Sequence, residues 1–408
     1  WLWLSAARAA CSGARCVSGG PSLFQPVHSL ALHLGGSGRA KLVWQALRSG
    51  RDPFLCEKVT RRAREALIEG GFARLPVEVD RTVSSDGTVK LLVALEDGQQ
   101  VESVVIPFEG RPTAAKKCEP RSTLCVSSQV GCSRGCIFCA TGRMGLIRNL
   151  TPDEILAQVV LAQRVIEELH MPKLHGLVFM GMGEPLNNPA SVRSALALLT
   201  DPQGFRLAST RISVSTVAPS PSAVRAAVDL PGMLAWSVHA ADDEKRKRLV
   251  PTTTHTMTEL RDAFLEVLEC RRQEGRRRST ALMVAVTLLK GINDDPADAR
   301  SLVELLQPIA DAGFKVCVDL IPYNDIGPDQ GANVQPLGAD SLFNIGAVEL
   351  SAASAALQRA EKSRISEFQA IVREAQMACF VRVTRGDDEA AACGQLATSS
   401  AKRRRRTD

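Results

Sequence analysis

The chain has 408 residues, of which 45% are hydrophobic, and it is long enough for one large α/β domain and an accessory piece. It contains no run of about 18 apolar residues, so the sequence does not predict a membrane-spanning helix. The formal net charge of +6 is concentrated in residues 1–51 and 402–408, and therefore does not by itself indicate a nucleic-acid-binding protein.

The first segment, residues 1–38, is predicted to be a disordered leader that ends at the Gly35-Gly36-Ser37-Gly38 breaker. It is rich in Ala, Ser, Arg and Gly and has no acidic residue, which is the composition of an organellar transit peptide. With a transit peptide we expect a chloroplast or mitochondrial protein, and otherwise a cytoplasmic one. A leader with no targeting role fits this composition equally well.

Residues 39–110 are predicted to form a small α+β accessory domain. Apolar residues recur at helical spacing between 41 and 75, which predicts two or three short helices. Apolar and polar residues then alternate over 88–93 and 101–106, on either side of an Asp-Gly turn, which predicts a β-hairpin.

Segments typical of strands and helices alternate between residues 118 and 392. The predicted strands are 124–130, 176–180, 212–216, 234–238, 283–288 and 315–320. The predicted helices are 152–169, 191–199, 221–228, 257–272 and 298–312. Six β/α units predict a parallel sheet or a partial (β/α)6 barrel. Beyond Pro322 the pattern weakens, and in the Gly-, Ala- and Ser-rich segment 326–360 a helix is predicted only from about Val348.

Three cysteines, Cys132, Cys136 and Cys139, follow the first predicted barrel strand within one short loop. Loops at this end of a barrel carry the chemistry. A 4Fe-4S cluster held by three thiolates keeps one iron free to bind the amino and carboxylate groups of a small molecule. A zinc or redox site is the alternative, but no fourth Cys or His lies nearby in the sequence. With Phe138 before the third cysteine, the motif resembles that of the radical S-adenosylmethionine (SAM) enzymes.

Polar residues also follow the later predicted strands. The turn Gly181-Met182-Gly183-Glu184-Pro185 comes directly after the second barrel strand, where ligands of parallel sheets bind, and it resembles the superfamily motif that holds the SAM amine. Ser215, Ser237, His239 and Asn324 stand at or just past the ends of predicted strands. Taken singly, each of these is more often a hydrogen-bonded strand end than a ligand.

Several longer strings make the resemblance closer. Between about residue 40 and residue 397 the chain is similar to the radical SAM methyltransferases that modify adenine C2 in 23S-type rRNA and in tRNA. The strings are Thr123–Cys132, Phe138–Gly142, Arg148–Thr151, Phe179–Asn188, Ser237–Ala240, Gly291–Asp294, Leu320–Asn324, Thr384–Asp388 and Ala391–Leu396. The resemblance implies a partial barrel, with residues 393–408 forming a C-terminal segment that carries a catalytic cysteine and a basic tail.

The resemblance also implies roles for single residues. Cys132, Cys136 and Cys139 would hold the 4Fe-4S cluster, and SAM would be bound by Gly183, Glu184, Ser215, Ser237, Val238, His239 and Asn324. Cys393 would carry a methyl group from a first SAM, and Glu102 would remove the C2 proton. Cys125 would then attack Cys393, so that a disulfide forms as the methylated base is released. A monomer that receives electrons from flavodoxin or ferredoxin and binds rRNA, and tRNA as a further substrate, is also implied.

Two rival functions remain compatible with these residues. The first is adenine C8 methylation by a related enzyme, which shares the cysteine pair and the cluster. The second is a non-catalytic RNA-binding protein with a structural zinc or iron–sulfur site. The chain also departs from the family pattern: Ala218 replaces a glycine, Val250–Thr254 lacks an asparagine, Asp319 replaces an asparagine, and the insertion after Asn324 is long.

Overall fold

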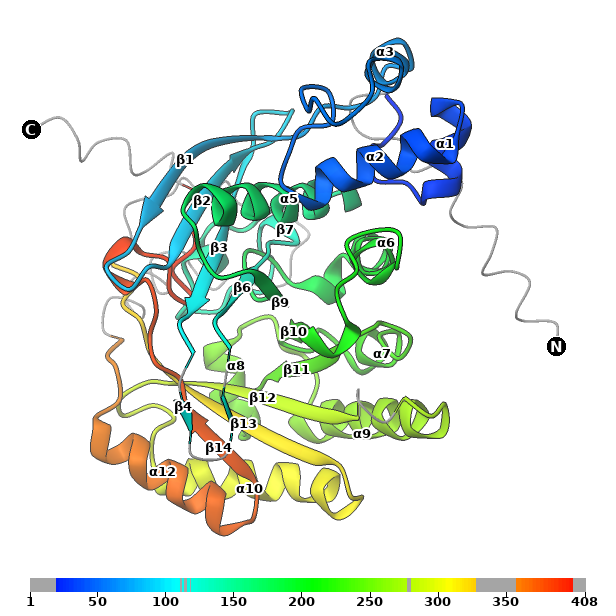
Figure 1. Ribbon diagram of the computed structural model, residues 1–408. Coiled ribbons are helices and arrows are strands. Elements are labelled where there is room, and N and C mark those ends of the chain that lie inside the picture. The colour runs from blue at the N-terminus through cyan, green and yellow to red at the C-terminus, as the bar shows by residue number, and fades with distance from the viewer. Residues whose placement is uncertain are drawn as a thin grey trace, which may run out of the picture.

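The computed structural model describes residues 20–110, 119–276, 280–327 and 357–398, and the backbone of 112–113 and 116–117. Its centre is one ten-stranded sheet in the order β1-β2-β3-β6-β9-β10-β11-β12-β13-β14 (Figure 1). The strands from β6 onward run parallel to one another, as the barrel prediction requires. Their bounds are β6 Arg121–Cys125, β9 Leu174–Phe179, β10 Ile212–Thr216, β11 Met233–Ser237, β12 Ala281–Leu288, β13 Lys315–Pro322 and β14 Ala378–Val381.

Amphipathic helices connect these strands and cover the outer face of the sheet (Figure 1). They are α5 Pro152–Glu168, α6 Pro189–Thr200, α7 Pro221–Arg225, α9 Met257–Gln273, α10 Pro296–Asp311 and α12 Lys362–Glu374. The N-termini of α5, α9 and α10 are each fixed by a capping box, in which the N-cap side chain and the third helical side chain satisfy free amides. The partial (β/α)6 barrel is thereby confirmed, and β14 adds one further parallel strand.

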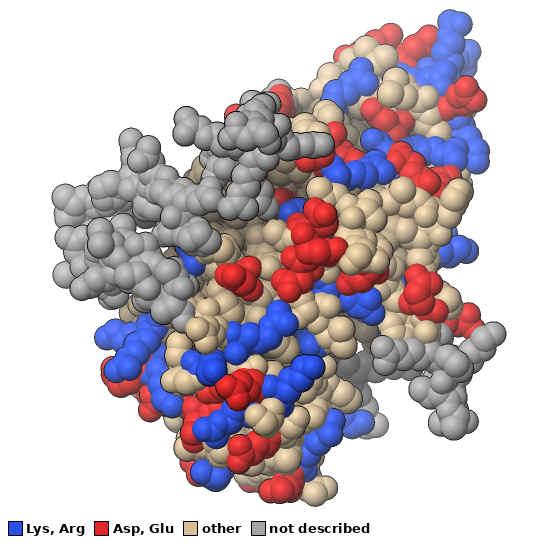
Figure 2. Space-filling model, turned by 90° about the vertical axis from the view of Figure 1, so that its left-hand side faces the viewer, with Lys and Arg blue, Asp and Glu red and all other residues tan. Residues whose placement is uncertain are grey.

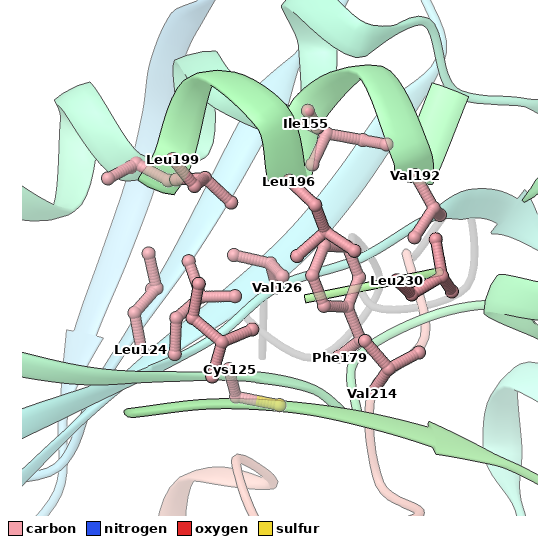
Figure 3. Close-up of a cluster of buried hydrophobic side chains, with 14 of the residues drawn as sticks. Leu124, Cys125, Val126, Ile155, Phe179, Val192, Leu196, Leu199, Val214 and Leu230 are labelled. Atoms are coloured by element: carbon pink, nitrogen blue, oxygen red, sulfur yellow. The ribbon is translucent and has the colours of Figure 1, made fainter. Parts of the chain in front are cut away.

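The core between helices and sheet is apolar. Figure 3 shows Leu196 and Leu199 of α6 and Ile155 of α5 above Phe179 of β9 and Val214 of β10. All five side chains are at most 2% exposed, so each contributes about 1.5–3 kcal/mol of burial free energy.

The N-terminal part joins the same sheet. Strands β1 (Val77–Val83), β2 (Val89–Ala94) and β3 (Gln100–Phe108) are antiparallel, which confirms the predicted hairpin, and β3 pairs with β6. Helices α2 (Ser37–Arg48) and α3 (Arg61–Glu69) precede them. The sheet therefore runs unbroken from the accessory segment into the barrel.

The predicted disordered leader over 1–38 is wrong for its last part. Residues Val27–Leu34 form helix α1, in which Leu30 and Leu34 are buried. Two leucines four residues apart lie on one helical face, and their burial favours a helix although glycines follow it in the sequence. Gly35 is not a boundary of disorder but the left-handed C-cap of α1, with φ of 67°. Residues 1–19 lie outside the described residues.

Other differences concern short elements. The predicted strand 124–130 is divided, because β6 ends at Cys125 and β7 (Gln129–Gly131) pairs with β8 (Leu146–Asn149) in a separate sheet. The start of the helix predicted from Val348 falls outside the described residues, and α12 begins at Lys362. In the part of the chain that the structure describes, no helix has the length and apolar character needed to cross a bilayer.

Candidate active site

A pocket opens at the carboxyl ends of the parallel strands, where the sequence predicted it. Ten of the thirteen predicted site residues line it: Cys132, Cys136, Cys139, Gly183, Glu184, Ser215, Ser237, His239, Asn324 and Cys393. The structure therefore brings together residues from the cysteine loop, four strand ends and the C-terminal segment. Val238, Glu102 and Cys125 do not line this pocket.

The cysteine loop connects β7 to the short helix α4 (Ala140–Arg143). Gly131 has φ of 73°, and a side chain there would collide with the Gly145 carbonyl, so this turn requires glycine. The Cys132 amide donates to the same Gly145 carbonyl at 2.8 Å. The loop is thus fixed at its first cysteine by backbone geometry.

The three thiols lie in a setting that disfavours their charged forms. Burial raises the pKa of Cys132 to about 12, and burial followed by repulsion from Cys139 raises the pKa of Cys136 well above its usual range. As thiolates they therefore need a cationic partner. Among the described residues, no three Cys, His, Asp or Glu side chains are gathered for a single metal ion.

Glu184 is held rigidly at the end of the β9 turn. Gly183 before it has φ of 99° and packs against Gln129, whose Oε1 accepts from the Glu184 amide at 2.8 Å. The two carboxylate oxygens accept from the amides of Leu186 and Val217, both at 2.9 Å. The side chain is 3% exposed, and burial raises its pKa. Its orientation is thus fixed before any ligand arrives.

Ser215 of β10 and Ser237 of β11 meet side by side, with their hydroxyl oxygens 3.1 Å apart. His239 follows β11 with φ of 59°, a left-handed conformation that costs a non-glycine residue about 1–2 kcal/mol. Its Nδ1 accepts from the Thr287 amide at 3.1 Å, and burial lowers its pKa well below 6.5. The imidazole is therefore neutral, and its proton is on Nε2, available as a donor.

The strained His239 backbone is held by Asn293, which sequence reasoning placed in a family string but gave no role. The Asn293 amide nitrogen donates to the His239 carbonyl at 2.6 Å and to the Thr287 carbonyl at 2.8 Å. Its own oxygen accepts from the Leu289 amide at 2.8 Å. Asn293 is only 1% exposed, and its side chain makes its hydrogen bonds within the protein. Together these bonds fix the position of the His239 backbone.

Asn324 and the C-terminal segment complete the pocket. The Asn324 amide donates to the Cys393 carbonyl at 3.1 Å. The Gly394 carbonyl accepts from the Ala140 amide at 2.7 Å, directly after the third cysteine of the loop. Cys393 is exposed and faces the same pocket as the cysteine loop. The cysteine loop and Cys393 are more than 250 residues apart in the sequence, and the fold brings them to one pocket.

Cys125 lies at the end of β6, and its sulfur points away from the hydrophobic cluster (Figure 3). Burial raises its pKa, the nearby Cys393 raises it further, and Arg382 opposes both. The implied disulfide is not present, since Cys125 and Cys393 are both free thiols in this structure.

Glu102 is buried on β3, with 5% exposure, rather than facing the pocket. One carboxylate oxygen accepts from the Ala397 amide at 2.8 Å, and the other lies 3.6 Å from the Lys90 ammonium. Ala397 is four residues after Cys393, so Glu102 anchors the segment that carries this cysteine.

Parallel strands with a ligand pocket at their carboxyl ends, and three cysteines supplied by one loop, define the class of radical SAM enzymes. The family model of the Radical SAM superfamily matches residues 126–303. A solved radical SAM methyltransferase from Sphaerobacter thermophilus superposes with a TM-score of 0.72 at 30% identity, over 92% of this chain and 97% of that chain.

Similar proteins of known name place the chain in one family within this class. The dual-specificity RNA methyltransferase RlmN of Sorangium cellulosum is 36% identical, over 92% of this chain and 93% of its own length. The ribosomal RNA large subunit methyltransferase N of Nitrosopumilus maritimus is 33% identical, over 84% and 86%. The chain belongs to the RlmN family of radical SAM RNA methyltransferases.

Proposed function

We propose that this chain methylates C2 of adenine in large-subunit rRNA and in tRNA, with two SAM molecules and a methyl-cysteine intermediate. The observation that carries the proposal is the position of Cys393 in the pocket of Cys132, Cys136 and Cys139. A methyl carrier must reach the place where the radical forms, and here the C-terminal segment is bound to the helix that follows the cysteine loop.

The pocket fits a 4Fe-4S cluster and SAM. The three thiols come from one loop and line the same pocket as the polar side chains at the strand ends. When bound, the cluster and SAM supply one-electron cleavage of SAM to a 5′-deoxyadenosyl radical. Glu184 would receive the ammonium group of SAM, while Ser215, Ser237, His239 and Asn324 would hold its other polar groups. Flavodoxin or ferredoxin would deliver the electron.

Cys393 and Cys125 have separate tasks. Adenine C2 has no useful nucleophilicity, so the methyl group is first placed on the Cys393 thiolate. The deoxyadenosyl radical would take one hydrogen atom from the S-methyl group, and the resulting carbon radical would add to C2. Once the adduct has returned one electron to the bound cluster, Glu102 would take the C2 proton, for which the Ala397 contact must open. Cys125 would then attack the Cys393 sulfur and break its bond to carbon, so that the carbon gains a proton and becomes the methyl group while a transient disulfide forms.

RNA would approach the side of the molecule opposite α6, α7 and α9. Figure 2 shows this face, where Lys and Arg side chains are interspersed with Asp and Glu side chains. Lys and Arg side chains on such a face would bind phosphates without reading sequence.

Expression in a bacterial strain that lacks its own adenine C2-methyltransferase tests the proposal. We expect 2-methyladenosine to return to rRNA and tRNA, identified by mass spectrometry and NMR of the digested nucleosides. A methyl group at C8, or purified protein that releases no 5′-deoxyadenosine after iron and sulfide reconstitution and reduction with SAM, would contradict it.

A further inference from the structure

Two arginines are completely buried at opposite ends of strand β11. Arg271, in the last turn of α9, donates to four carbonyls before the strand, among them Gly232 at 3.1 Å. Arg246 lies at the other end, in helix α8 (Asp243–Leu249), and donates to the carbonyls of Ser237 at 2.8 Å, Val217 at 2.7 Å, and Val238. Both side chains are 0% exposed. A comparison of the two arginines isolates the effect of closeness to the pocket, because only Arg246 is next to it.

Arg246 holds the backbone from which the SAM-binding residues project. Its carbonyl partners lie at the ends of β10 and β11, just after Ser215 and just before His239. The Val217 peptide unit connects it to Glu184, since Val217 donates its amide to the Glu184 carboxylate and accepts at its carbonyl from Arg246. The guanidinium therefore braces two strand ends at once.

The charge of Arg246 is not balanced by any ion pair among the residues that the structure describes. Its Nε also has no hydrogen-bond partner there. Burial lowers its pKa to about 10, so it stays charged at neutral pH, and the groups that attract it are Cys136 first and Glu184 second. An unbalanced buried charge costs several kcal/mol.

Helix α8 is attached to the cysteine loop. The Leu249 carbonyl accepts from the Ile137 amide at 3.2 Å, and Ile137 directly follows Cys136. Leu249 also packs in one apolar cluster with Cys136 and Phe138. Helix α8 therefore holds Arg246 close to the thiols. The other acidic group that attracts Arg246, Glu184, is the partner of the SAM ammonium in the proposed function.

We propose that Arg246 stabilises the reduced iron–sulfur cluster electrostatically: its charge is balanced by the thiolates that hold the cluster, and it favours the reduced state. Reduction adds one negative charge to the site, and a fixed nearby cation stabilises that state in a medium of low dielectric constant. This inference rests on the proposed function, because it requires the cluster.

The test uses the full chain, reconstituted with iron and sulfide, without SAM or RNA. Arg246→Met removes the charge and keeps the aliphatic volume, and Arg246→Lys keeps the charge. Arg271→Met is the matched control, since it removes an equally buried guanidinium at the far end of β11. The midpoint potential of each protein is measured by EPR-monitored titration.

For Arg246→Met we expect full iron content and a reduced-to-oxidised ratio about tenfold lower at a fixed potential, equal to about 59 mV for one electron. Arg246→Lys should recover most of this change, and Arg271→Met should leave the potential unchanged. Loading the cluster should also raise the unfolding temperature of the wild type more than that of Arg246→Met.

Two results would overturn the inference. One is a full cluster at unchanged potential in Arg246→Met. The other is failure of both Arg246 variants to fold while Arg271→Met folds, which would make Arg246 only a clamp of strand ends. A wild-type chain that binds no cluster would instead contradict the proposed function, so the two failures are distinguishable.

Discussion

The Asp319 carboxylate on β13 accepts a hydrogen bond from Nε of Arg382 at 2.8 Å, and the same guanidinium lies near Cys125 and Cys393. The sequence showed Asp319 only as a departure from the asparagine of related proteins. The structure gives the departure a reason, because the carboxylate balances a partly buried cation near the two cysteines that the proposed mechanism uses.

Asp319→Asn should therefore lower the free energy of unfolding by about 1 kcal/mol, since an amide oxygen can still accept the bond but brings no charge. Asp319→Ala should cost more, because it leaves the Arg382 donors without this acceptor. Urea unfolding of the cluster-free protein measures both. An asparagine variant at least as stable as the wild type would contradict the charge-balance argument.

Ala218 is the second departure, and it has φ of 58° where the related proteins have glycine. Ala218→Gly should stabilise the protein by about 0.5 kcal/mol, because relief of left-handed strain exceeds the loss of one buried methyl group. Ala223→Gly, in the helical conformation of α7, is the control and should destabilise. Urea unfolding is again the measurement, and a loss of stability in Ala218→Gly would refute the strain assignment.

Asn293→Ala should weaken SAM binding about tenfold without loss of iron, because the left-handed His239 loses the bond that holds its carbonyl. Calorimetric titration of the reconstituted protein with SAM measures this. Asp294→Asn is the neighbouring control, since Asp294 contacts the Gly291 amide of its own loop and not His239. Equal affinities in both variants would show that Asn293 does not position the histidine.

Substitutions of Cys393 and Cys125 should have different effects. Cys393→Ala should hold the cluster and form no methyladenine, whereas Cys125→Ala should accumulate a protein–RNA crosslink that survives denaturing purification. The double variant should be free of RNA. Normal turnover by Cys125→Ala, or crosslinking without Cys393, would exclude the methyl-cysteine mechanism.

Acid should loosen the C-terminal segment. Hydrogen bonds from Ser84 and from the Ser85 amide lower the pKa of Asp388 to about 2. Because the pKa of Asp388 is lower in the folded than in the unfolded protein, its carboxylate stabilises the folded state above a pH of about 4. This stabilisation is lost as the pH falls toward about 2. Hydrogen exchange over residues 386–397 should therefore speed up in this window, after correction for the intrinsic rate. Asp388→Asn should show the faster exchange at neutral pH, and identical protection in variant and wild type would contradict the prediction.

Elements with a clear apolar pattern between turn or cap residues could be predicted from the sequence, and elements without such a pattern could not. Strand β10 has the predicted bounds, because its apolar residues are bracketed by clear turn and cap residues. Helix α8 was missed, since its Asp-Glu-Lys-Arg-Lys-Arg run has the composition of a solvated face, although Arg246 within it is buried. Strand β14 has only four residues, of which one is buried.

The same limit applies to the site. The positions of the cysteine loop, Glu184 and the strand-end residues followed from motifs that directly succeed predicted strands. The partners of Glu102 could not be inferred in this way, because Ala397 is 295 residues away in the sequence. Periodicity and spacing carry no information on such a contact.

The late position of Cys393 in the sequence sets the order in which the parts of the site are synthesised. Cys393 is the last cysteine of the sequence, and its segment is fixed to β2 and β3 through Lys90 and Glu102. While the chain emerges from a ribosome, the cysteine loop and the strand ends are made long before Cys393, the methyl carrier of the proposed function. A cluster that assembled on the loop at that stage would form without Cys393, so this thiol could not act as a fourth ligand.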